Sequence, residues 1–394
     1  MGESPVRSAG LVQGWTLVAS AWLAVFASAA LLGPVLPSMT AHFRGTPALD
    51  VMISFVATLP SLFVALLAIP FGLLADRIGH WRVMFWATLV YGVVGVLPYW
   101  LESLPAIVVA RGAVGIAEAA IMTCGAALIG HYYSAARAPR WWALQTGTAP
   151  IAAAVAIAVG GALGDRSWHT PFLVYGFGLV LFVLVATQLW EPPLVEARTA
   201  GADRDAARVN WPRLLGICLI TVFAMCAFMI TVIQTSFLLT ERGIPSPAAI
   251  GRWQSLSSLA NPLGALLFGV LRWRAPAKLA LSMMLMAVGF ALMGWLTGWQ
   301  ATLAGAAITN LGCGMVLPTL ITWALEGLPA AARGSGAGAW MAASFLGQFL
   351  SPLSIVALRG LSGTLASAIL SYAAACAVVG IVTLLLRFKK EPVP

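Results

Sequence analysis

The sequence has 394 residues, of which 60% are hydrophobic and only 9% are charged, and its formal net charge at pH 7 is +9. A soluble domain carries roughly 25% charged residues because its surface faces water, so this composition excludes an ordinary soluble protein. The apolar runs are long and nearly unbroken, which favours transmembrane helices over the short alternating strands of a membrane β-barrel.

We expect an all-α membrane protein with twelve transmembrane helices, arranged as two pseudo-symmetric six-helix bundles. About 20 apolar residues are needed to cross a bilayer core. In chain order the expected spans are 14–37, 50–73, 81–101, 105–129, 141–163, 171–190, 212–239, 248–271, 277–298, 301–325, 335–358 and 365–386. The first run is too long for the apolar core of a signal peptide, and further spans follow it directly.

One long hydrophilic connection interrupts this pattern. Residues 191–213 are polar and charged, and they follow the sixth apolar run. The sequence therefore predicts an N-terminal bundle at 1–190, a cytoplasmic linker at 191–211 and a C-terminal bundle at 212–394. An offset of 197 residues aligns the two parts at four pairs of identical residues, which are Gly72 and Gly269, Leu74 and Leu271, Arg77 and Arg274, and Gly115 and Gly312.

The positive charge is distributed by side. With both termini placed in the cytoplasm, sixteen lysines and arginines fall on the cytoplasmic side and five on the outer side, with Arg111 inside a span. This asymmetry follows the positive-inside rule and predicts a multi-pass protein of the inner membrane with both termini cytoplasmic. The basic charge is thus explained by the lipid bilayer, and we expect no nucleic-acid partner.

The segment 72–82, GLLADRIGHWR, lies between the second and third expected spans. It resembles the signature loop of the major facilitator superfamily, which helps to hold the cytoplasmic gate of those transporters. Gly72 allows close helix approach and Gly79 permits a sharp turn. Asp76, Arg77 and Arg82 carry charges that can hold neighbouring helix ends together, so these five residues are the candidate gating residues.

Further resemblances cover most of the chain. Arg111 and Gly112 match an arginine motif of the fourth helix, and segment 161–172 is similar to the link between helices five and six. Segment 333–352 resembles the drug- and metabolite-exporter branch. One departure is that Ala156 and Ile157 stand where antiporters carry Gly-Pro, which leaves the direction of transport open. The resemblance implies alternating access around a solute site near the midplane.

Two ionisable residues, Arg111 and Glu118, lie deep in the fourth expected span. A charge inside the membrane is costly and indicates a functional role by default. Arg111 either anchors an anionic solute or bonds the backbone of the first helix. Glu118 either carries the coupled proton, or pairs with a cationic solute, or is a packed and protonated residue; we favour coupling because no other acid lies so deep.

Uncharged residues complete the candidate site. The resemblance implies that helices one, four, seven and ten line the cavity, which selects Trp22, Thr231, Gln234 and Asn310 as candidate solute contacts, although helix–helix hydrogen bonding is the alternative role for each. The five cysteines lie within apolar runs without a Cys-x-x-Cys spacing, so we expect no disulfide and no metal site, and we expect no cofactor.

We therefore expect a monomeric secondary-active transporter of a small organic solute rather than an enzyme. The sequence has no phosphate-binding glycine loop, so we expect a gradient rather than ATP hydrolysis by this chain to drive transport. Proton-coupled efflux of a drug-like compound or metabolite is favoured. The alternatives are proton-coupled uptake of an organic anion or chelate and, from another class, a non-transporting membrane sensor.

Overall fold

The computed structural model describes residues 9–192, 210–326, 328–329 and 332–386, and within these residues every regular element is helical. The first group of elements is α1 (Leu11–Ala27), α2 (Ala29–Leu32), η1 (Gly33–Val35), α3 (Leu36–His42), α4 (Leu49–Ile78), α5 (His80–Val96), η2 (Leu97–Tyr99), α6 (Leu104–Tyr132), α7 (Ala138–Gly164), η3 (Thr170–Gly176) and α8 (Phe177–Gln188). The second group is α9 (Trp211–Glu241), α10 (Pro247–Ser258), α11 (Ala260–Val270), α12 (Ala275–Trp295), α13 (Trp299–Leu325), α14 (Arg333–Ser362) and α15 (Leu365–Leu386).

Ten of the described helices are long and apolar enough to cross a membrane. The first expected span is a bent pair, residues 11–27 and 29–42, with an angle of 52° at the break, and it raises the number to eleven. The eighth expected span is divided into α10 and α11 at Leu259. Pro262 contributes to this break, because it has no N–H to bond the carbonyl of Ser258. The count of twelve therefore stays a prediction.

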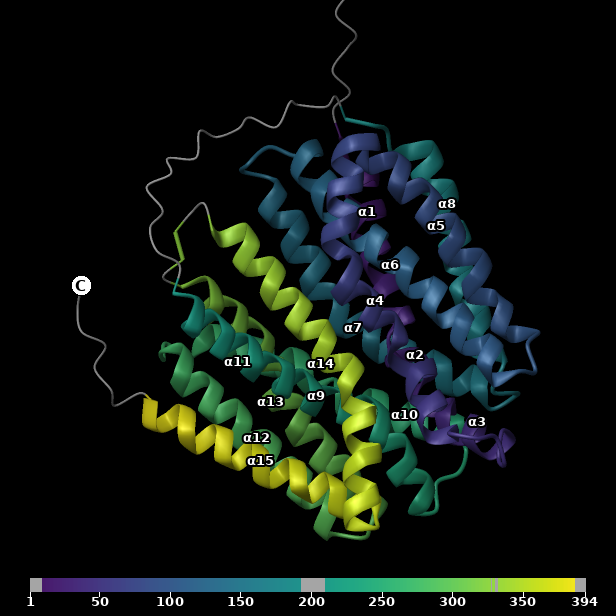
Figure 1. Cartoon of the computed structure of the whole chain (residues 1–394), viewed down its shortest axis with the longest axis vertical. Helices are drawn as coiled ribbons and strands as arrows, with labels where there is room; N and C mark the ends of the chain where they lie inside the picture. The colour runs from purple at the N-terminus through teal and green to yellow at the C-terminus, as the bar shows by residue number, and fades with distance from the viewer. Residues whose placement is uncertain (1–8, 193–209, 327, 330–331, 387–394) are drawn as a thin grey trace, which may run out of the picture.

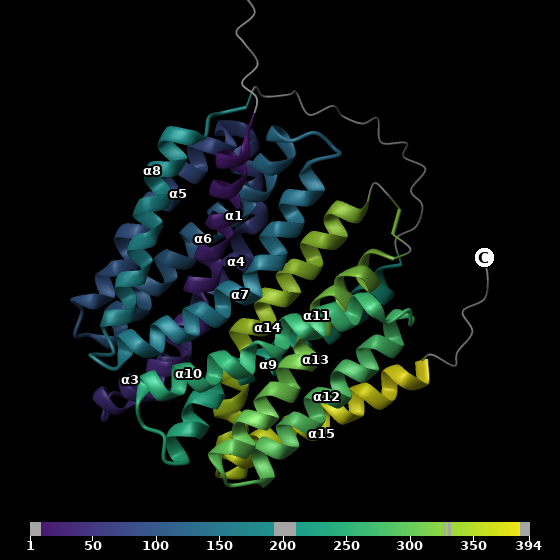
Figure 2. The same ribbon diagram turned by 180° about the vertical axis from the view of Figure 1, so that it is seen from behind.

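Two hydrophobic cores lie within the described residues. The first joins α1–α8 and includes Met229 and Ile233 from α9. The second joins α9 with α12–α15. Figures 1 and 2 show the corresponding two groups of helices, purple to teal and green to yellow, side by side. Most of the linker expected at 191–211 lies outside the described residues, so the division at that point stays a prediction.

The two groups contact each other on the side that the charge count predicts to be outer. There α7 and α10 meet at Gly161 and Gly251, and a Cβ added to Gly161 would lie 2.7 Å from the Cα of Gly251. The Ser246 hydroxyl also donates to Asp165 at 2.7 Å. Close packing of backbone on backbone is possible here because neither glycine carries a side chain.

A second contact joins α4 to α14. The rings of Phe55 and Phe349 stack with their centroids 6.0 Å apart. The Thr58 hydroxyl donates to the carbonyl of Phe349 at 3.3 Å. In contrast, Gly147 near the other end of α7 and Gly338 near the other end of α14 have space for a Cβ with nothing within 4 Å.

Candidate functional site

Both deeply placed charges lie on α6 and are enclosed by protein. Arg111 is 1% exposed and Glu118 is 3% exposed. They are seven residues apart in the sequence and lie on nearly the same face of the helix. No ion pair joins them within the described part of the chain, as the rise of about 10 Å over seven helical residues leads us to expect.

Arg111 satisfies backbone groups that the break after α1 exposes. The last carbonyls of a helix have no intrahelical partner, and α1 ends at Ala27. The Nη2 group of Arg111 donates to the Ala27 carbonyl, and Nε donates to the carbonyl of Val56 on α4 at 2.7 Å. A cation at a helix C-terminus is also favoured by the helix dipole. Arg111 therefore joins the broken end of α1 to α4 and α6.

Two buried tyrosines complete this arrangement. Arg111 Nη1 donates to the Tyr175 hydroxyl at 2.5 Å, and that hydroxyl donates to the Phe26 carbonyl at 2.8 Å. The Tyr91 hydroxyl donates to the Leu23 carbonyl at 2.7 Å, and the two tyrosine rings are 5.6 Å apart. All three nitrogen atoms of the guanidinium are thus used by groups of the protein itself.

Glu118 lies about two turns further along α6 than Arg111, and one of its oxygens makes no hydrogen bond to a described residue. Its Oε2 atom is buried and has no partner among the described residues. An enclosed carboxyl without a partner is less costly in its protonated form than as an anion. The chemistry available to Glu118 is therefore the uptake and release of a proton when water or a solute reaches it.

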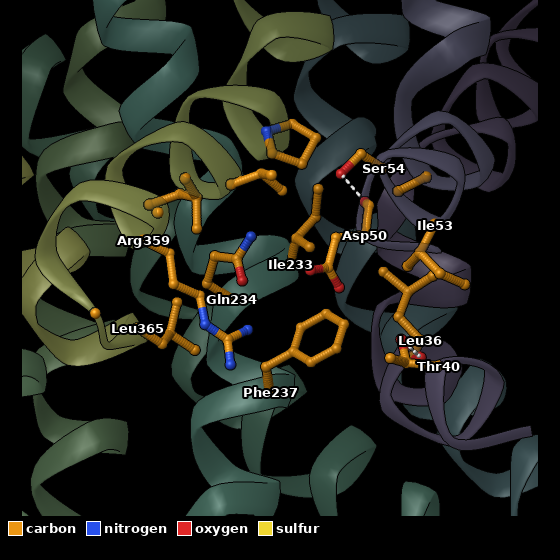
Figure 3. Close-up of a pocket in the computed structure, with 16 residues that line it drawn as sticks. Leu36, Thr40, Asp50, Ile53, Ser54, Ile233, Gln234, Phe237, Arg359 and Leu365 are labelled. Carbon is orange, nitrogen blue, oxygen red and sulfur yellow. Dashed lines mark hydrogen bonds between the residues drawn. The ribbon is translucent and has the colours of Figure 1, made fainter. Parts of the chain in front are cut away.

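A separate cavity of ≈ 470 Å³ lies between the two helix groups, near the predicted outer side. Figure 3 shows three polar side chains directed into it from different elements. They are Asp50 of α4, Gln234 of α9 and Arg359 of α14. Gln234 is the one sequence-predicted solute contact that lines this cavity.

The other candidate contacts are engaged elsewhere. The indole Nε1 of Trp22 donates to Thr148 at 3.0 Å and so joins α1 to α7. The Thr231 hydroxyl donates to the carbonyl of Phe228 at 2.6 Å, within its own helix. Asn310 does the same with the Ala306 carbonyl at 2.9 Å. Arg111 and Glu118 do not line the cavity either, so the structure does not bring the predicted contacts together in one site.

The candidate gating loop is built around Gly79 and Glu191, an acid that follows the end of α8. Gly79 has a φ of +108°, and a Cβ there would lie 2.2 Å from Oε2 of Glu191. The same oxygen accepts from the backbone N–H of Arg82 at 3.3 Å. A carboxylate at the start of α5 is stabilised by the helix dipole. The Asp76 carboxylate lies 3.4 Å from His80, not against an arginine side chain.

The remaining gating residues make few contacts. A Cβ on Gly72 would lie 3.6 Å from Thr123 of α6, which agrees with a close helix approach. The side chain of Arg82 donates to the Ile78 carbonyl at 3.4 Å, and Arg77 is exposed. No ion pair joins Asp76 to Arg77 or Arg82 among the described residues, and the gating role of the five residues stays a prediction.

Five residues that belong to the surroundings of Arg111, to the gating loop or to the cavity were not selected from the sequence. They are Asp50, Tyr91, Tyr175, Glu191 and Arg359. A polar tip on an aromatic residue in the middle of an apolar run, as at Tyr91, is a usable signal because a buried hydroxyl needs a partner. Asp50 and Arg359 sit at span ends, where charges are common, and no local pattern indicates that they share a cavity. No group of three or more His, Cys, Asp or Glu side chains within the described ranges could hold a metal ion.

Comparison with known families identifies the chain. The family model of the Major Facilitator Superfamily matches residues 18–352. The chain belongs to the major facilitator superfamily. It is therefore a multi-pass membrane transporter of a small solute and not an enzyme, as the sequence predicts. Comparison with curated proteins found no match.

Solved structures share the fold at low sequence identity. A D-xylose-proton symporter has a TM-score of 0.78 and 15% identity, and the alignment covers 97% of this chain and 98% of that one. A bacterial homologue of the human lysosomal transporter Spinster, inward-facing and unoccupied, has a TM-score of 0.73 and 14% identity, with 96% of each chain covered. A nucleoside transporter has a TM-score of 0.73 and 16% identity over 95% and 100%. These likenesses show the fold alone.

Proposed function

We propose that this member of the superfamily is a monomeric, secondary-active transporter that moves a small organic solute by alternating access and couples transport to protons through Glu118. The observation that carries the coupling is the enclosed Oε2 atom of Glu118, which has no hydrogen-bond partner among the described residues. A carboxyl that must be neutral when enclosed and ionises when solvated can carry one proton per cycle.

The arrangement of the two helix groups supports alternating access. Their contact at α7–α10 lies on the predicted outer side and the contact of α4 with Phe349 lies at the middle of α14, whereas Gly147 and Gly338 toward the other side meet nothing within 4 Å. Both termini are assigned to the cytoplasm and the protein to the inner membrane by the distribution of lysine and arginine. The bundles are assigned to 1–190 and 212–394.

Efflux of a drug-like compound or metabolite is the proposed direction, on the resemblance of segment 333–352 to the exporter branch. Uptake of an organic anion anchored by Arg111 is less well supported. The three nitrogen atoms of Arg111 already donate to Ala27, Val56 and Tyr175, so an anion would have to displace protein acceptors.

The test is proton flux in proteoliposomes on addition of solutes, with purified wild type, Glu118→Gln and Glu326→Gln. Glu326 is an exposed residue at the end of α13 and serves as the matched control. We expect solute-triggered proton flux in wild type and Glu326→Gln, and none in Glu118→Gln.

Proton flux that persists in Glu118→Gln would place coupling at another residue. Solute counterflow without proton movement would identify a uniporter or exchanger, and the absence of both would favour a sensor. In inverted vesicles the interior corresponds to the outer side of the membrane. Solute uptake into these vesicles that occurs only when their interior is acidic would establish efflux.

A further inference from the structure

Two opposite charges from the two helix groups share the cavity near the predicted outer side. Asp50 comes from α4 and Arg359 from α14, and Figure 3 shows both side chains directed into the same space. No ion pair within 4.0 Å joins these two described residues. An anionic and a cationic group thus face one cavity without neutralising each other by direct contact.

Gln234 adds an uncommitted amide between them. Its side chain is 7% exposed, it lines the cavity, and it makes no hydrogen bond to any described residue. Its amide atoms are not among the buried side-chain atoms without a partner, so they are open to the cavity, where a solute can form hydrogen bonds to them in place of water. The hydroxyls of Ser54 and Thr40 donate to the carbonyls of Asp50 and Leu36 on their own helices, and neither makes a hydrogen bond to Gln234.

The rest of the cavity wall is largely apolar. Its aliphatic and aromatic members are Leu36, Ile53, Ile233, Phe237, Ile355 and Leu365. Asp50 and Arg359 are both exposed, so water screens the attraction between them and a solute, and the apolar walls strengthen that attraction only by displacing part of this water. The volume of ≈ 470 Å³ is in the range of small-molecule sites.

We propose that this cavity binds a small zwitterion with an apolar body. Its ammonium group pairs with Asp50, its carboxylate is bound by the planar guanidinium of Arg359, and the amide of Gln234 completes the polar contacts. A cation or an anion alone would pair with one of the two exposed protein charges and leave the other to water, whereas a zwitterion pairs with both. The inference rests on the proposed function, since it names the solute class that such a transporter would carry.

The first test is binding to the purified wild-type protein in detergent, measured by titration calorimetry. The probes are leucine, 6-aminohexanoate, which separates the two charges further, 4-methylpentanoate, which is leucine without its amino group, and 3-methylbutylamine, which is leucine without its carboxylate. We expect at least one zwitterion to bind about tenfold or more tighter than both singly charged probes, because it makes one more charged contact than either of them. If neither zwitterion binds, or if a singly charged probe binds as tightly, the proposal is wrong.

The second test assigns the two charges. In Asp50→Asn the affinity for the zwitterion should fall to that for 4-methylpentanoate, and in Arg359→Gln it should fall to that for 3-methylbutylamine. Gln234→Leu should lower the affinity for the zwitterion in the same assay. If the two charge variants instead weaken every probe equally, or none, the two charges do not recognise the solute and the proposal is wrong. Thermal unfolding of each variant, together with the double reversal of Asp50→Arg and Arg359→Asp, separates loss of folding from loss of recognition, because the reversed pair presents the same two charges.

The two proposals fail independently. Binding in detergent needs no gradient, and Glu118→Gln should bind the zwitterion as wild type does. Zwitterion binding without proton flux in proteoliposomes would overturn proton coupling and leave the solute class standing. Proton flux triggered only by solutes that are not zwitterions would overturn the solute class and leave proton coupling standing.

Discussion

Replacing Gly161 by alanine tests whether the contact of α7 with α10 keeps the two helix groups together on the predicted outer side. A Cβ at this position would lie 2.5 Å from the Pro247 carbonyl oxygen and 2.7 Å from the Gly251 Cα, where ordinary contact begins at 3.4 Å. Both neighbours are backbone atoms, so the helices themselves must move apart by several tenths of an ångström. Overpacking of this kind costs about 1–3 kcal/mol.

That cost falls only on the conformation in which the two helices touch. A change of about 1–3 kcal/mol shifts a two-state equilibrium roughly 5- to 150-fold, here toward the conformation open to the outer side. Gly147→Ala is the matched control, because it makes the same substitution on the same helix at a position with nothing within 4 Å.

The assay is the reaction of a single introduced cysteine with a membrane-impermeant maleimide in right-side-out vesicles. Ala57→Cys is the reporter, since Ala57 lines the cavity between the groups and is 1% exposed; the five native cysteines are first replaced. We expect labelling at least several-fold faster with Gly161→Ala and unchanged with Gly147→Ala. Equal labelling rates in the two variants would refute the reasoning that this contact closes the outer side.

Three further predictions concern stability, each measured by thermal unfolding in detergent. Arg111→Gln should lower the free energy of unfolding by about 3 kcal/mol or more, because at least two buried acceptors lose their donor; an unchanged stability would contradict the bonds to Ala27 and Val56. Glu191→Gln should cost about 0.3–1 kcal/mol at the start of α5, whereas a wild-type melting temperature would contradict that contact. Burial lowers the pKa of His169 below 6.5, and this effect outweighs the nearby Glu102, whose negative charge raises the pKa. The unfolded chain therefore takes up the proton first, stability falls as the pH drops below 6.5, and His169→Gln should reduce this fall.

The fold could be predicted from the sequence because membrane insertion imposes a simple rule. An apolar run near 20 residues has few alternatives to a spanning helix, and the runs that form α4, α6 and α9 follow it. The division of the eighth run at Leu259 is harder to predict, since Pro262 and the polar residues around it are also tolerated in continuous membrane helices.

The candidate site was predicted only in part, because hydropathy shows which groups are buried and not which groups meet. Arg111 and Glu118 stand out in an apolar run and are indeed enclosed. The position of Arg111 beside Ala27 depends on the break of α1 at Ser28, and no proline or glycine marks that residue in the sequence. Asp50 and Arg359 are 309 positions apart, so their shared cavity follows from the packing of the two groups and from nothing local.

The break after α1 connects the two parts of the proposed mechanism by direct contacts. On one side, the carbonyls of Phe26 and Ala27 accept from Tyr175 and Arg111, and Arg111 belongs to the same helix as Glu118. On the other side, the chain that continues from the break packs on α9, where a Cβ on Gly33 would lie 2.8 Å from the carbonyl oxygen of Val232. Val232 precedes Gln234 by two residues, so the groups around the buried carboxyl and the cavity with the two free charges rest on the same short stretch of backbone. A rearrangement at one therefore has a physical route to the other that needs no distant coupling.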